Sequence, residues 1–411
     1  MATNLKRVYL VCHEFSPEQG SECKGGWNIA LELNKIVDLT VVAAETNQWG
    51  SQNYRLAVEK NVEARKLNIL WISQPKKYKR PSNFGSNIFS QVSYFLRLRG
   101  WNRAVIKKLK NHQIDVLHFY NHISFRAFDS GFSPLATKII IGPVSGVQIF
   151  PLGFLNFGII YNCNLLLRSA INFVHRFLKR SAFQAENISA IFAVTLDDVK
   201  YFEGLNKRVI ALSDMAQDSE LGEVDLVHDN RNFDSEIRLL WVGRLDNLKC
   251  LDIILEVFSR SRIINSRFKL TVLGDGENFL KYERIIAEHK LNILLEGRVP
   301  FKSVRDFMIA SDLMVHSSLK EAGSAVANEA LSVKLPIMCH DAFGFSIHLD
   351  DHYVIKIPFI SFETSVQGFQ KELENIARNN SVLSQLRSNI KNHFMPTTWE
   401  DHAIIINKEY E

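Results

Sequence analysis

The sequence has little cysteine and arranges none of it in pairs. Five cysteines are scattered among 411 residues, and no Cys-x-x-Cys occurs. An odd, dispersed set argues against a disulfide framework and against a thiolate zinc site, and it favours a reducing compartment. The five are Cys12, Cys23, Cys163, Cys250 and Cys339.

Long apolar runs are also missing. The most apolar long stretch, residues 149–167, is interrupted by Pro151, Gly153 and Gly158. We therefore do not expect it to span a membrane. No signal peptide is recognisable before the strand-like run at residues 8–11. We expect a cytoplasmic protein.

Acidic residues are absent from two stretches. Residues 76–111 contain ten Lys or Arg and no Asp or Glu, and residues 151–180 contain four and none. Aromatic residues lie among these cations: Tyr78, Phe84, Phe89, Tyr94, Phe95, Trp101, Phe154, Phe157, Phe173 and Phe177. The pattern fits docking on anionic lipid, and it also fits a solvated basic face over an ordinary core. The net charge of +5 is modest and no nucleic-acid module is recognisable, so we expect no nucleic-acid partner.

What the sequence does contain is a regular alternation of strand and helix signals. At 411 residues, the chain is expected to form two domains. Apolar runs separated by amphipathic segments predict a parallel sheet covered on both faces in the first half. These runs occur at residues 8–11, 39–44, 67–72, 116–119, 139–141 and 188–194.

The second half repeats the pattern, with strands predicted at residues 237–242, 269–273, 293–295, 313–316 and 336–339. We therefore expect an α/β protein with two doubly wound, Rossmann-like domains that face a cleft, where ligands bind at the carboxyl ends of the strands. The expected boundaries are 1–213 for the first domain, 214–236 for a polar linker, 237–390 for the second domain and 391–411 for a C-terminal helix that crosses back to the first domain.

Four features of the second half follow predicted strands. Arg244 and Lys249, five residues apart, are suited to a diphosphate at the start of a helix. Gly274-Asp275-Gly276 predicts a tight turn, and the segment 296–300 offers backbone groups to a planar base. The last feature is a pair of carboxylates, Glu321 and Glu329, with a predicted helix start between them. Each feature alone also fits a plain turn, surface charge or chance spacing, but their order favours one site.

In this order the motifs resemble those of the GT-B-fold glycosyltransferases of retaining family four, also called group 1, of the bacterial surface-polysaccharide type. The likeness covers residues 237–344. It rests on Val242-Gly243-Arg244, Lys249, Leu273–Gly276, Gly297-Arg298-Val299, Ser318, Glu321, Glu329-Ala330, Leu335-Pro336-Ile337 and Gly344. Ala322 departs from the Gly that many members have, which leaves the transferred sugar open.

The resemblance implies roles for these residues. Arg244 and Lys249 would bind the donor diphosphate, Glu321 would contact the transferred sugar, and Glu329 would bind the ribose hydroxyls. The predicted donor-binding residues are Gly243, Arg244, Lys249, Gly274, Arg298, Val299, Gly323, Ser324, Ala325 and Glu329. The predicted catalytic residues are Glu321, Arg244, Lys249 and His122.

The first half, the expected acceptor-binding domain, carries a weaker signal. Residues 13–27 are expected to form a long loop similar to the Gly-rich first loop of the family, with Glu22, Gly25 and Gly26 as acceptor or phosphate contacts. The segment 141–146 is similar to a Gly-Pro-x-Gly-Gly element of the polysaccharide enzymes. His118 and His122 lie at the next strand end, where either one is a sugar contact, a proton relay or a structural histidine.

These observations predict a retaining, hexosyltransferase-like enzyme of EC class 2.4. It would move a sugar from a nucleoside-diphosphate sugar to a saccharide or lipid-linked saccharide in cell-surface polysaccharide biosynthesis, with peripheral association at the inner face of the cytoplasmic membrane. No cofactor and no metal are expected, because no Asp-x-Asp occurs and cations and helix N-termini can stabilise the leaving diphosphate.

Other functions stay open at this point. A sugar-nucleotide epimerase, a phosphorylase or a non-catalytic partner subunit would share the same two-domain architecture. A nicotinamide-dependent dehydrogenase is disfavoured, because no Gly-x-Gly-x-x-Gly follows a strand. The nucleotide base, the sugar, the acceptor, the linkage and the oligomeric state are not predicted.

Overall fold

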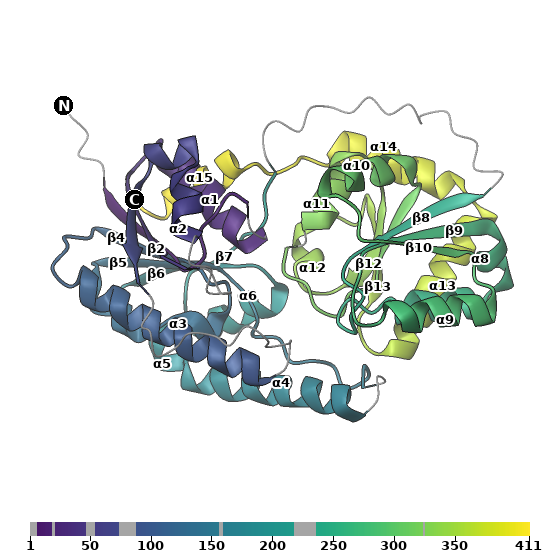
Figure 1. Ribbon diagram of the computed structural model, residues 1–411, viewed down its shortest axis with the longest axis horizontal. Coiled ribbons are helices and arrows are strands. Elements are labelled where there is room, and N and C mark those ends of the chain that lie inside the picture. Colours follow the sequence, from purple (N-terminus) through teal and green to yellow (C-terminus); the bar gives the residue numbers. More distant parts are fainter. Residues whose placement is uncertain are drawn as a thin grey trace. The chain divides into compact units, whose positions relative to one another are not determined.

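The computed structural model describes residues 6–18, 21–46, 54–73, 88–155, 159–217, 236–323 and 325–411 (Figure 1). The chain forms two compact units. The N-terminal unit comprises Met1–Ile149, Leu166–Ala216 and Thr397–Glu411, and the C-terminal unit comprises Phe150–Leu165 and Gln217–Pro396. Most of the expected linker lies outside the described residues.

The N-terminal unit is built on a parallel seven-stranded sheet in the order β3-β2-β1-β4-β5-β6-β7. Its strands are β1 Arg7–Cys12, β2 Asp38–Ala44, β3 Asn68–Ile72, β4 Val116–Asn121, β5 Lys138–Val144, β6 Ile188–Ala193 and β7 Val209–Ala211. The apolar runs of these strands are buried on both faces because helices cover both sides of the sheet.

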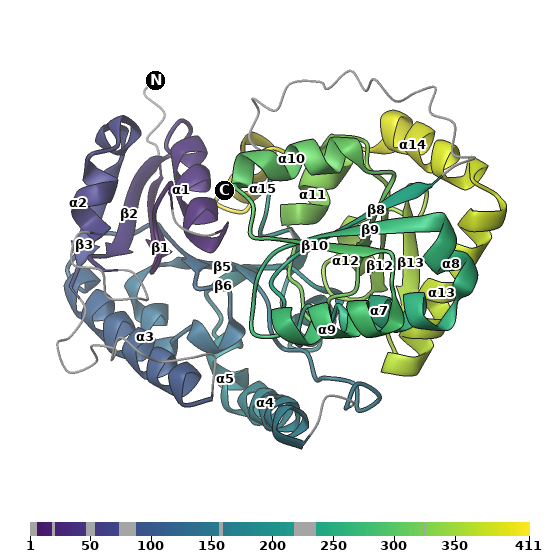
Figure 2. The ribbon, with the colours of Figure 1, turned by 45° about the vertical axis from the view of Figure 1, so that its right-hand side comes forward.

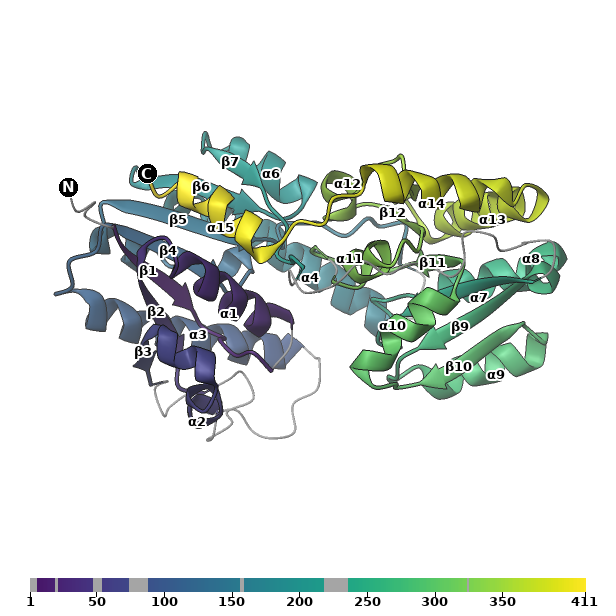
Figure 3. The same cartoon turned by 90° about the horizontal axis from the view of Figure 1, so that it is seen from above.

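Two hydrophobic cores flank this sheet. One contains Trp27 of α1 and Trp399 of α15, and the other contains Trp101 of α3. Figure 3 shows α15 beside α1. The helices are α1 Ser21–Leu33, α2 Tyr54–Glu59, α3 Ile88–Leu109, α4 Ile159–Leu178, α5 Arg180–Phe183, α6 Leu196–Glu203 and α15 Trp399–Lys408, with 3-10 turns η1 Val62–Lys66, η3 Phe125–Ala127 and η4 Ser130–Leu135. The first residues of α4 belong to the C-terminal unit and the rest to the N-terminal unit.

The C-terminal unit has a parallel six-stranded sheet in the order β10-β9-β8-β11-β12-β13 (Figure 2). Its strands are β8 Ile237–Val242, β9 Phe268–Leu273, β10 Ile293–Gly297, β11 Leu313–His316, β12 Ile337–Asp341 and β13 Val354–Pro358. Successive residues of β8 alternate between faces: Leu239 and Trp241 enter one core, and Leu240 enters the other.

Helices cover both faces of this sheet as well. α7, α9 and α13 contribute to the core that contains Trp241, whereas α10 and α11 contribute to the opposite core. The helices are α7 Asp252–Arg260, α8 Arg262–Arg267, α9 Phe279–His289, α10 Phe301–Ala310, α11 Ala325–Ser332, α12 Phe345–His348, α13 Phe362–Arg378 and α14 Ser381–His393. The predicted α/β class with two doubly wound sheets is confirmed.

One segment lies in a different unit from the one expected. Residues 150–165 were expected in the first domain, but they group with the C-terminal unit. Phe154 is fully buried in the core of that unit, and its ring is stacked on Phe359 with centroids 4.4 Å apart. The backbone N–H of Phe362 also donates to the Gly153 carbonyl at 3.0 Å. Burial of the Phe154 ring holds this segment in the C-terminal unit. The spacing of apolar residues in the sequence does not show this contact.

No helix among the described residues is both long enough and apolar enough to cross a bilayer.

Candidate active site

The sheet order of the C-terminal unit places two loops side by side. From β8 the chain proceeds to β9 and β10 on one side, and it later returns to β11 on the other side of β8. Loops that follow two such neighbouring strands lie beside each other at the carboxyl edge of the sheet, where ligands bind in open α/β folds. The residues after β8 and after β11 include Lys249 and Glu321.

Hydrogen bonds fasten these two loops together. The backbone N–H of Leu319 donates to the Leu248 carbonyl at 2.7 Å. The Ser317 hydroxyl donates to the Cys250 carbonyl at 2.8 Å and accepts from the Trp241 indole at 3.2 Å. Because Ser317 and Trp241 are buried, these bonds hold the β11 loop at a fixed place beside the β8 loop.

The fastened loops bring a lysine, a glutamate and a histidine into contact. Lys249 Nζ bonds to Glu321 Oε1, and His316 Nε2 lies 2.9 Å from the same oxygen. The side chain of Lys249 is 23% exposed, that of Glu321 10% and that of His316 only 3%. The site is therefore a partly buried ion pair with an open side at the lysine.

This environment favours the ionised form of Glu321. Burial is the largest influence and raises its pKa, but the charge of Lys249 and the hydrogen bond from His316 together outweigh burial and lower the pKa to about 2. Nε2 of His316 must carry a proton to donate to this carboxylate. Glu321 is thus a carboxylate at neutral pH, held by two donors.

Close backbone contacts shape the floor of the same edge. Gly274 has a φ of +142°, and a Cβ there would lie 1.8 Å from the Gly243 carbonyl oxygen. A Cβ on Gly344 would lie 2.3 Å from the Ala322 carbonyl oxygen. Only glycine permits either approach, so these residues let the loops after β8, β9 and β11 pack against their neighbours.

The remaining cations lie at the same strand ends but in different surroundings. Arg244 is 72% exposed and pairs with Asp246 at 3.0 Å. Arg298 follows β10 and is exposed, and Val299 packs against the core that contains α10 and α11. Gly274 is tied to this segment through its N–H, which donates to the Gly297 carbonyl at 2.7 Å.

The loop after β11 leads into α11, where the other predicted donor residues lie. Gly323 precedes the helix, Ala325 is its first residue and Glu329 is half-buried within it. Ser324 lies outside the described residues. Gln217 donates to the Asn328 carbonyl at 2.8 Å and thereby anchors the end of the interdomain segment to α11.

The N-terminal unit has an equivalent point in its sheet. β1 lies between β2 and β4, so the residues after β1 and after β4 meet at its carboxyl edge. Glu22 accepts a hydrogen bond from the backbone N–H of Ile123 at 2.9 Å, and its Oε1 lies 3.5 Å from His122 Nδ1. Both side chains are partly exposed.

The long loop expected at residues 13–27 is shorter than predicted. Helix α1 begins at Ser21, so Glu22, Gly25 and Gly26 are helical. A Cβ on Gly26 would lie 3.0 Å from the Asn121 amide nitrogen, and one on Gly25 would lie 3.4 Å from the Trp399 ring. Both glycines therefore allow α1 to pack closely against its neighbours within the unit, whereas they were predicted to expose backbone to a ligand.

His118 is a structural residue. It is fully buried in β4. Its Nε2 donates to the Gly142 carbonyl at 2.6 Å, and its Nδ1 accepts from the Tyr410 hydroxyl at 2.7 Å. Burial lowers its pKa to about 4. Of the alternatives left open for His118, the structural histidine is the one that holds, because both ring nitrogens are used within the core.

His316 was missed at the sequence level. A histidine at the end of an apolar strand is more often a satisfied core residue, and the strand pattern Leu313–His316 gave no reason to separate it from the core. The available signal was its position five residues before Glu321. That spacing joins the end of β11 to the carboxylate of the loop that follows.

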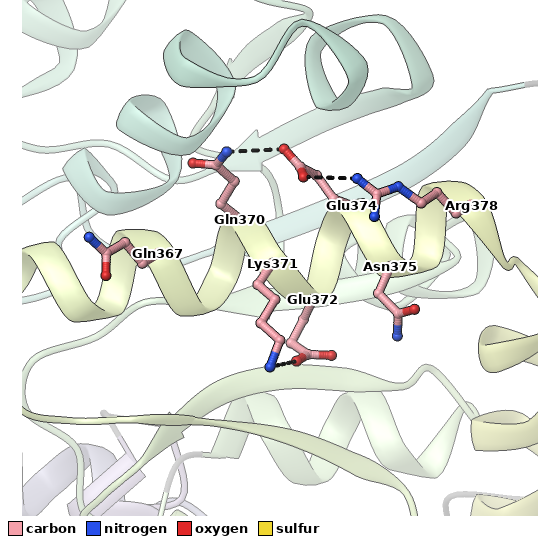
Figure 4. Close-up of a pocket in the computed structure, with 7 residues that line it drawn as sticks. All are labelled: Gln367, Gln370, Lys371, Glu372, Glu374, Asn375 and Arg378. Carbon is pink, nitrogen blue, oxygen red and sulfur yellow. Dashed lines mark hydrogen bonds and ion pairs between the residues drawn. The ribbon is translucent and has the colours of Figure 1, made fainter.

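A surface hollow elsewhere in the C-terminal unit does not belong to this site. Figure 4 shows that all of its lining side chains come from α13. They are Gln367, Gln370, Lys371, Glu372, Glu374, Asn375 and Arg378. Several of them pair with one another, as when Gln370 and Arg378 donate to Glu374 at 3.0 and 3.5 Å. None of the predicted site residues lines the hollow. Among the described residues, no cluster of His, Cys, Asp and Glu is arranged to hold a metal ion.

Comparison with known proteins agrees with this geometry. Residues 225–393 match the family model described as glycosyl transferases group 1. The chain is 28% identical over 149 residues to the phosphatidylinositol N-acetylglucosaminyltransferase GPI3 subunit of Saccharomyces cerevisiae. This match covers 36% of this chain and 33% of the GPI3 subunit. It is also 37% identical over 113 residues to the putative teichuronic acid biosynthesis glycosyltransferase TuaC of Bacillus subtilis. This match covers 28% of this chain and 27% of TuaC. The match thus spans about a third of these relatives or less.

The fold similarity extends over the whole chain. The crystal structure of Anabaena Alr3699/HepE in complex with UDP superposes with a TM-score of 0.61 at 12% identity and covers 99% of this chain and all of that chain. The fold is therefore GT-B, as predicted. The residues that match the group 1 model include the Lys249–Glu321 pair.

Proposed function

We propose that the whole chain is a retaining glycosyltransferase that transfers a sugar from a nucleoside-diphosphate sugar to a saccharide or lipid-linked saccharide. The observation that carries the proposal is the Lys249–Glu321 pair, which lies where the strand order reverses between β8 and β11 in the sheet of the C-terminal unit. A cation and a carboxylate at this place match the two halves of the donor, which are an anionic diphosphate and a hydroxyl-rich sugar.

Lys249 and Arg244 have distinct parts in this proposal. Lys249 is partly buried, so its charge acts on the diphosphate through a medium of low effective dielectric constant. Arg244 is largely exposed beside Asp246 and closes on the diphosphate from the solvent side. Both cations stabilise the negative charge that develops on the leaving nucleotide.

Glu321 is assigned to the transferred sugar. With its pKa lowered to about 2, it is an acceptor only, and a sugar hydroxyl can donate to the oxygen that His316 and Lys249 leave available. Glu329 on α11 is assigned to the ribose hydroxyls. Gly243, Gly274, Gly323 and Ala325 are assigned to backbone contacts with the nucleotide, and Arg298 and Val299 are assigned to the base; the predicted contact at Ser324 falls outside the described residues.

The proposed route needs no protein nucleophile. The acceptor hydroxyl attacks the anomeric carbon on the face from which the diphosphate departs. The C–O bond to the diphosphate breaks, and a diphosphate oxygen takes the acceptor proton. Retention of configuration follows from this same-face geometry. The proposal includes no metal, because Lys249 and Arg244 supply the positive charge.

The acceptor side is assigned to the N-terminal unit. Glu22 and His122 lie together at the carboxyl edge of its sheet and can hold a sugar hydroxyl between them. A role in cell-surface polysaccharide biosynthesis, in the cytoplasm at the inner face of the membrane, is supported by the similarity to TuaC, whose name assigns it to teichuronic acid biosynthesis.

Donor binding tests the proposal directly. UDP at a hundred times its dissociation constant should stabilise the protein by about 2.7 kcal/mol, measured by thermal shift against a panel of nucleoside diphosphates. Lys249→Ala should lose this stabilisation, whereas Lys281→Ala, which removes an exposed lysine paired with Asp252, should keep it. If no nucleoside diphosphate stabilises the protein, the donor assignment is wrong.

Product analysis then separates transfer from its rivals. A sugar nucleotide labelled in the sugar should pass its label to an added saccharide and release the nucleoside diphosphate. Label that stays on the nucleotide with altered stereochemistry would instead identify an epimerase. Donor binding without any turnover across saccharide acceptors would identify a non-catalytic subunit.

A further inference from the structure

Helix α4 is attached to the N-terminal unit through its polar side. Asn172 donates to the Gln148 carbonyl at 2.7 Å, and Arg176 Nε donates to the Val147 carbonyl at 2.9 Å. The Tyr201 hydroxyl donates to the Arg176 carbonyl at 2.7 Å, and Lys179, just after the helix, donates to the Phe128 carbonyl. The polar groups of this helix are therefore used within the unit.

The opposite side of α4 is apolar and exposed. Six large apolar side chains that recur at helical spacing are between 42% and 68% exposed: Leu166, Leu167, Phe173, Val174, Phe177 and Leu178. The rings of Phe173 and Phe177 pack together with centroids 5.1 Å apart. A surface helix of a globular protein normally buries its apolar side and exposes its polar side. The reverse arrangement marks an interaction surface.

Helix α3 presents exposed cations on the same side of the sheet as the N-terminal unit's part of α4 (Figure 1). Arg99, Arg103 and Lys107 of α3 and Lys110, the residue just after it, are exposed and recur every three or four residues, which aligns them along one side of the helix. α3 and α4 contain no Asp or Glu. The charge of Arg99 acts on Lys179, just after the end of α4, so the cationic side of α3 comes close to the C-terminal end of α4.

The sequence alone placed the cations differently. Of the four basic residues in 151–180, Arg176 and Lys179 are bound to carbonyl groups of the unit, Arg168 is half-buried, and Arg180, which follows α4, is exposed. The cationic part of the surface therefore comes mainly from α3 and the apolar part from α4. Residues 76–87, which supply four more of the predicted cations, lie outside the described residues.

We propose that this α3–α4 surface, formed by the four cations along α3 and at its C-terminal end and by the six apolar side chains of α4, docks on an anionic lipid bilayer. Phenylalanine and leucine side chains enter the boundary between headgroups and acyl chains, and the cations contact anionic headgroups beside them. Charge complementarity selects this partner, because no acid on either helix repels such a surface. The inference extends the proposed function by naming where the enzyme meets a lipid-linked acceptor.

Vesicle flotation with the full chain tests the surface without donor or acceptor. Wild-type protein should float with vesicles of phosphatidylcholine and phosphatidylglycerol and should stay unbound with phosphatidylcholine alone. Neutralising two cations with Arg103→Gln and Lys107→Gln should weaken binding about 25-fold, roughly fivefold for each cation. A second variant, Phe173→Ser with Phe177→Ser, should lose binding at any salt concentration.

Matched variants control for general effects. Lys60→Gln with Lys391→Gln neutralises two exposed lysines elsewhere, and Leu280→Ser removes an equally exposed apolar side chain of α9. Both should float as wild type does. All variants should keep the stabilisation by UDP, so a failed donor site and a failed docking surface give different results.

The proposal is overturned if wild-type protein does not bind anionic vesicles, or if both α3–α4 variants bind as well as the controls. It is also overturned if light scattering shows that the wild type is a dimer and that the Phe173 and Phe177 variant is a monomer, because the apolar face would then be an interface between copies.

Discussion

Each unit places a carboxylate at the point where its strand order reverses, but on a different loop and with different partners: Glu321 follows β11, whereas Glu22 follows β1. In the C-terminal unit Glu321 bonds to a lysine on the neighbouring loop and to a histidine at the end of its own strand β11. In the N-terminal unit Glu22 accepts from a backbone N–H and lies beside His122. Sheet order thus determines where side chains from distant segments converge, whereas the identity of the partners determines the charge that a ligand meets.

The loops that carry these carboxylates also differ in construction. In the C-terminal unit, glycines let backbone segments pack against one another, and Glu321 lies on a loop before its helix. In the N-terminal unit, Glu22 is already in the first turn of α1. In the proposed function, the first arrangement would place backbone groups near the nucleotide, and the second would receive a neutral, hydroxyl-bearing acceptor.

Removing Lys249 should have the largest effect. We expect Lys249→Ala to lower kcat/KM for transfer by about a hundredfold or more, since one charge-stabilising donor is lost at the reacting diphosphate. Steady-state transfer from a sugar nucleotide measures this. Lys281→Ala, at an exposed ion pair of the same unit, should retain wild-type rates. Near-normal transfer by Lys249→Ala would mean that Lys249 does not stabilise the diphosphate.

The two histidines of the N-terminal unit should separate stability from activity. His118→Ala leaves the Gly142 carbonyl and the Tyr410 hydroxyl without their buried partner, so the free energy of unfolding should fall by about 1–3 kcal/mol. His122→Ala should change stability by less than about 0.5 kcal/mol, but it should lower transfer about fivefold to tenfold through one lost acceptor contact.

Urea unfolding and transfer assays on both histidine variants make this measurement. If His122→Ala leaves the transfer rate unchanged, or loses as much stability as His118→Ala, then His122 is a structural residue and not an acceptor contact.

The pH dependence of stability should show the smallest difference. The pKa of Glu321 is lowered from 4.5 to about 2 in the folded state, so its contribution is present above pH 4.5 and is lost as the pH falls toward 2. The difference in unfolding free energy between wild type and Glu321→Gln should therefore shrink over that range, measured by urea unfolding.

A surface carboxylate supplies the control for this measurement. Glu363 pairs with Arg260 but is half-exposed, so Glu363→Gln should show a weaker pH dependence. A pH-independent difference for Glu321→Gln would mean that Lys249 and His316 do not hold its carboxylate in solution.

Much of the fold could be predicted because parallel strands that are buried on both faces consist of short runs of consecutive apolar residues. The predicted strands at residues 237–242 and 313–316 coincide with β8 and β11. The three-residue edge strand β7 and the short helix α8 were not predicted, because segments of that length have no periodicity to detect. The exposed apolar face of α4 was hidden as well, since periodicity defines a face but not the direction in which it points.

The candidate site could be predicted as a set of strand-end residues but not as a set of contacts. The motif order located Lys249 and Glu321 at neighbouring loops. The histidine that donates to Glu321 escaped notice because His316 ends an apolar strand. The helical packing of Gly25 and Gly26 also could not be predicted, because glycine serves close helix packing as well as ligand loops, and the sequence does not show the contacts with Trp399 and Asn121.

The path of the backbone has a consequence for biosynthesis. The N-terminal unit includes Thr397–Glu411, and the C-terminal unit includes Phe150–Leu165. The ribosome therefore delivers most of the first unit early, but the helix that carries Trp399 is synthesised only after the second unit. The usual order, in which an N-terminal domain is finished before the next begins, does not apply, and neither unit corresponds to one uninterrupted piece of the gene.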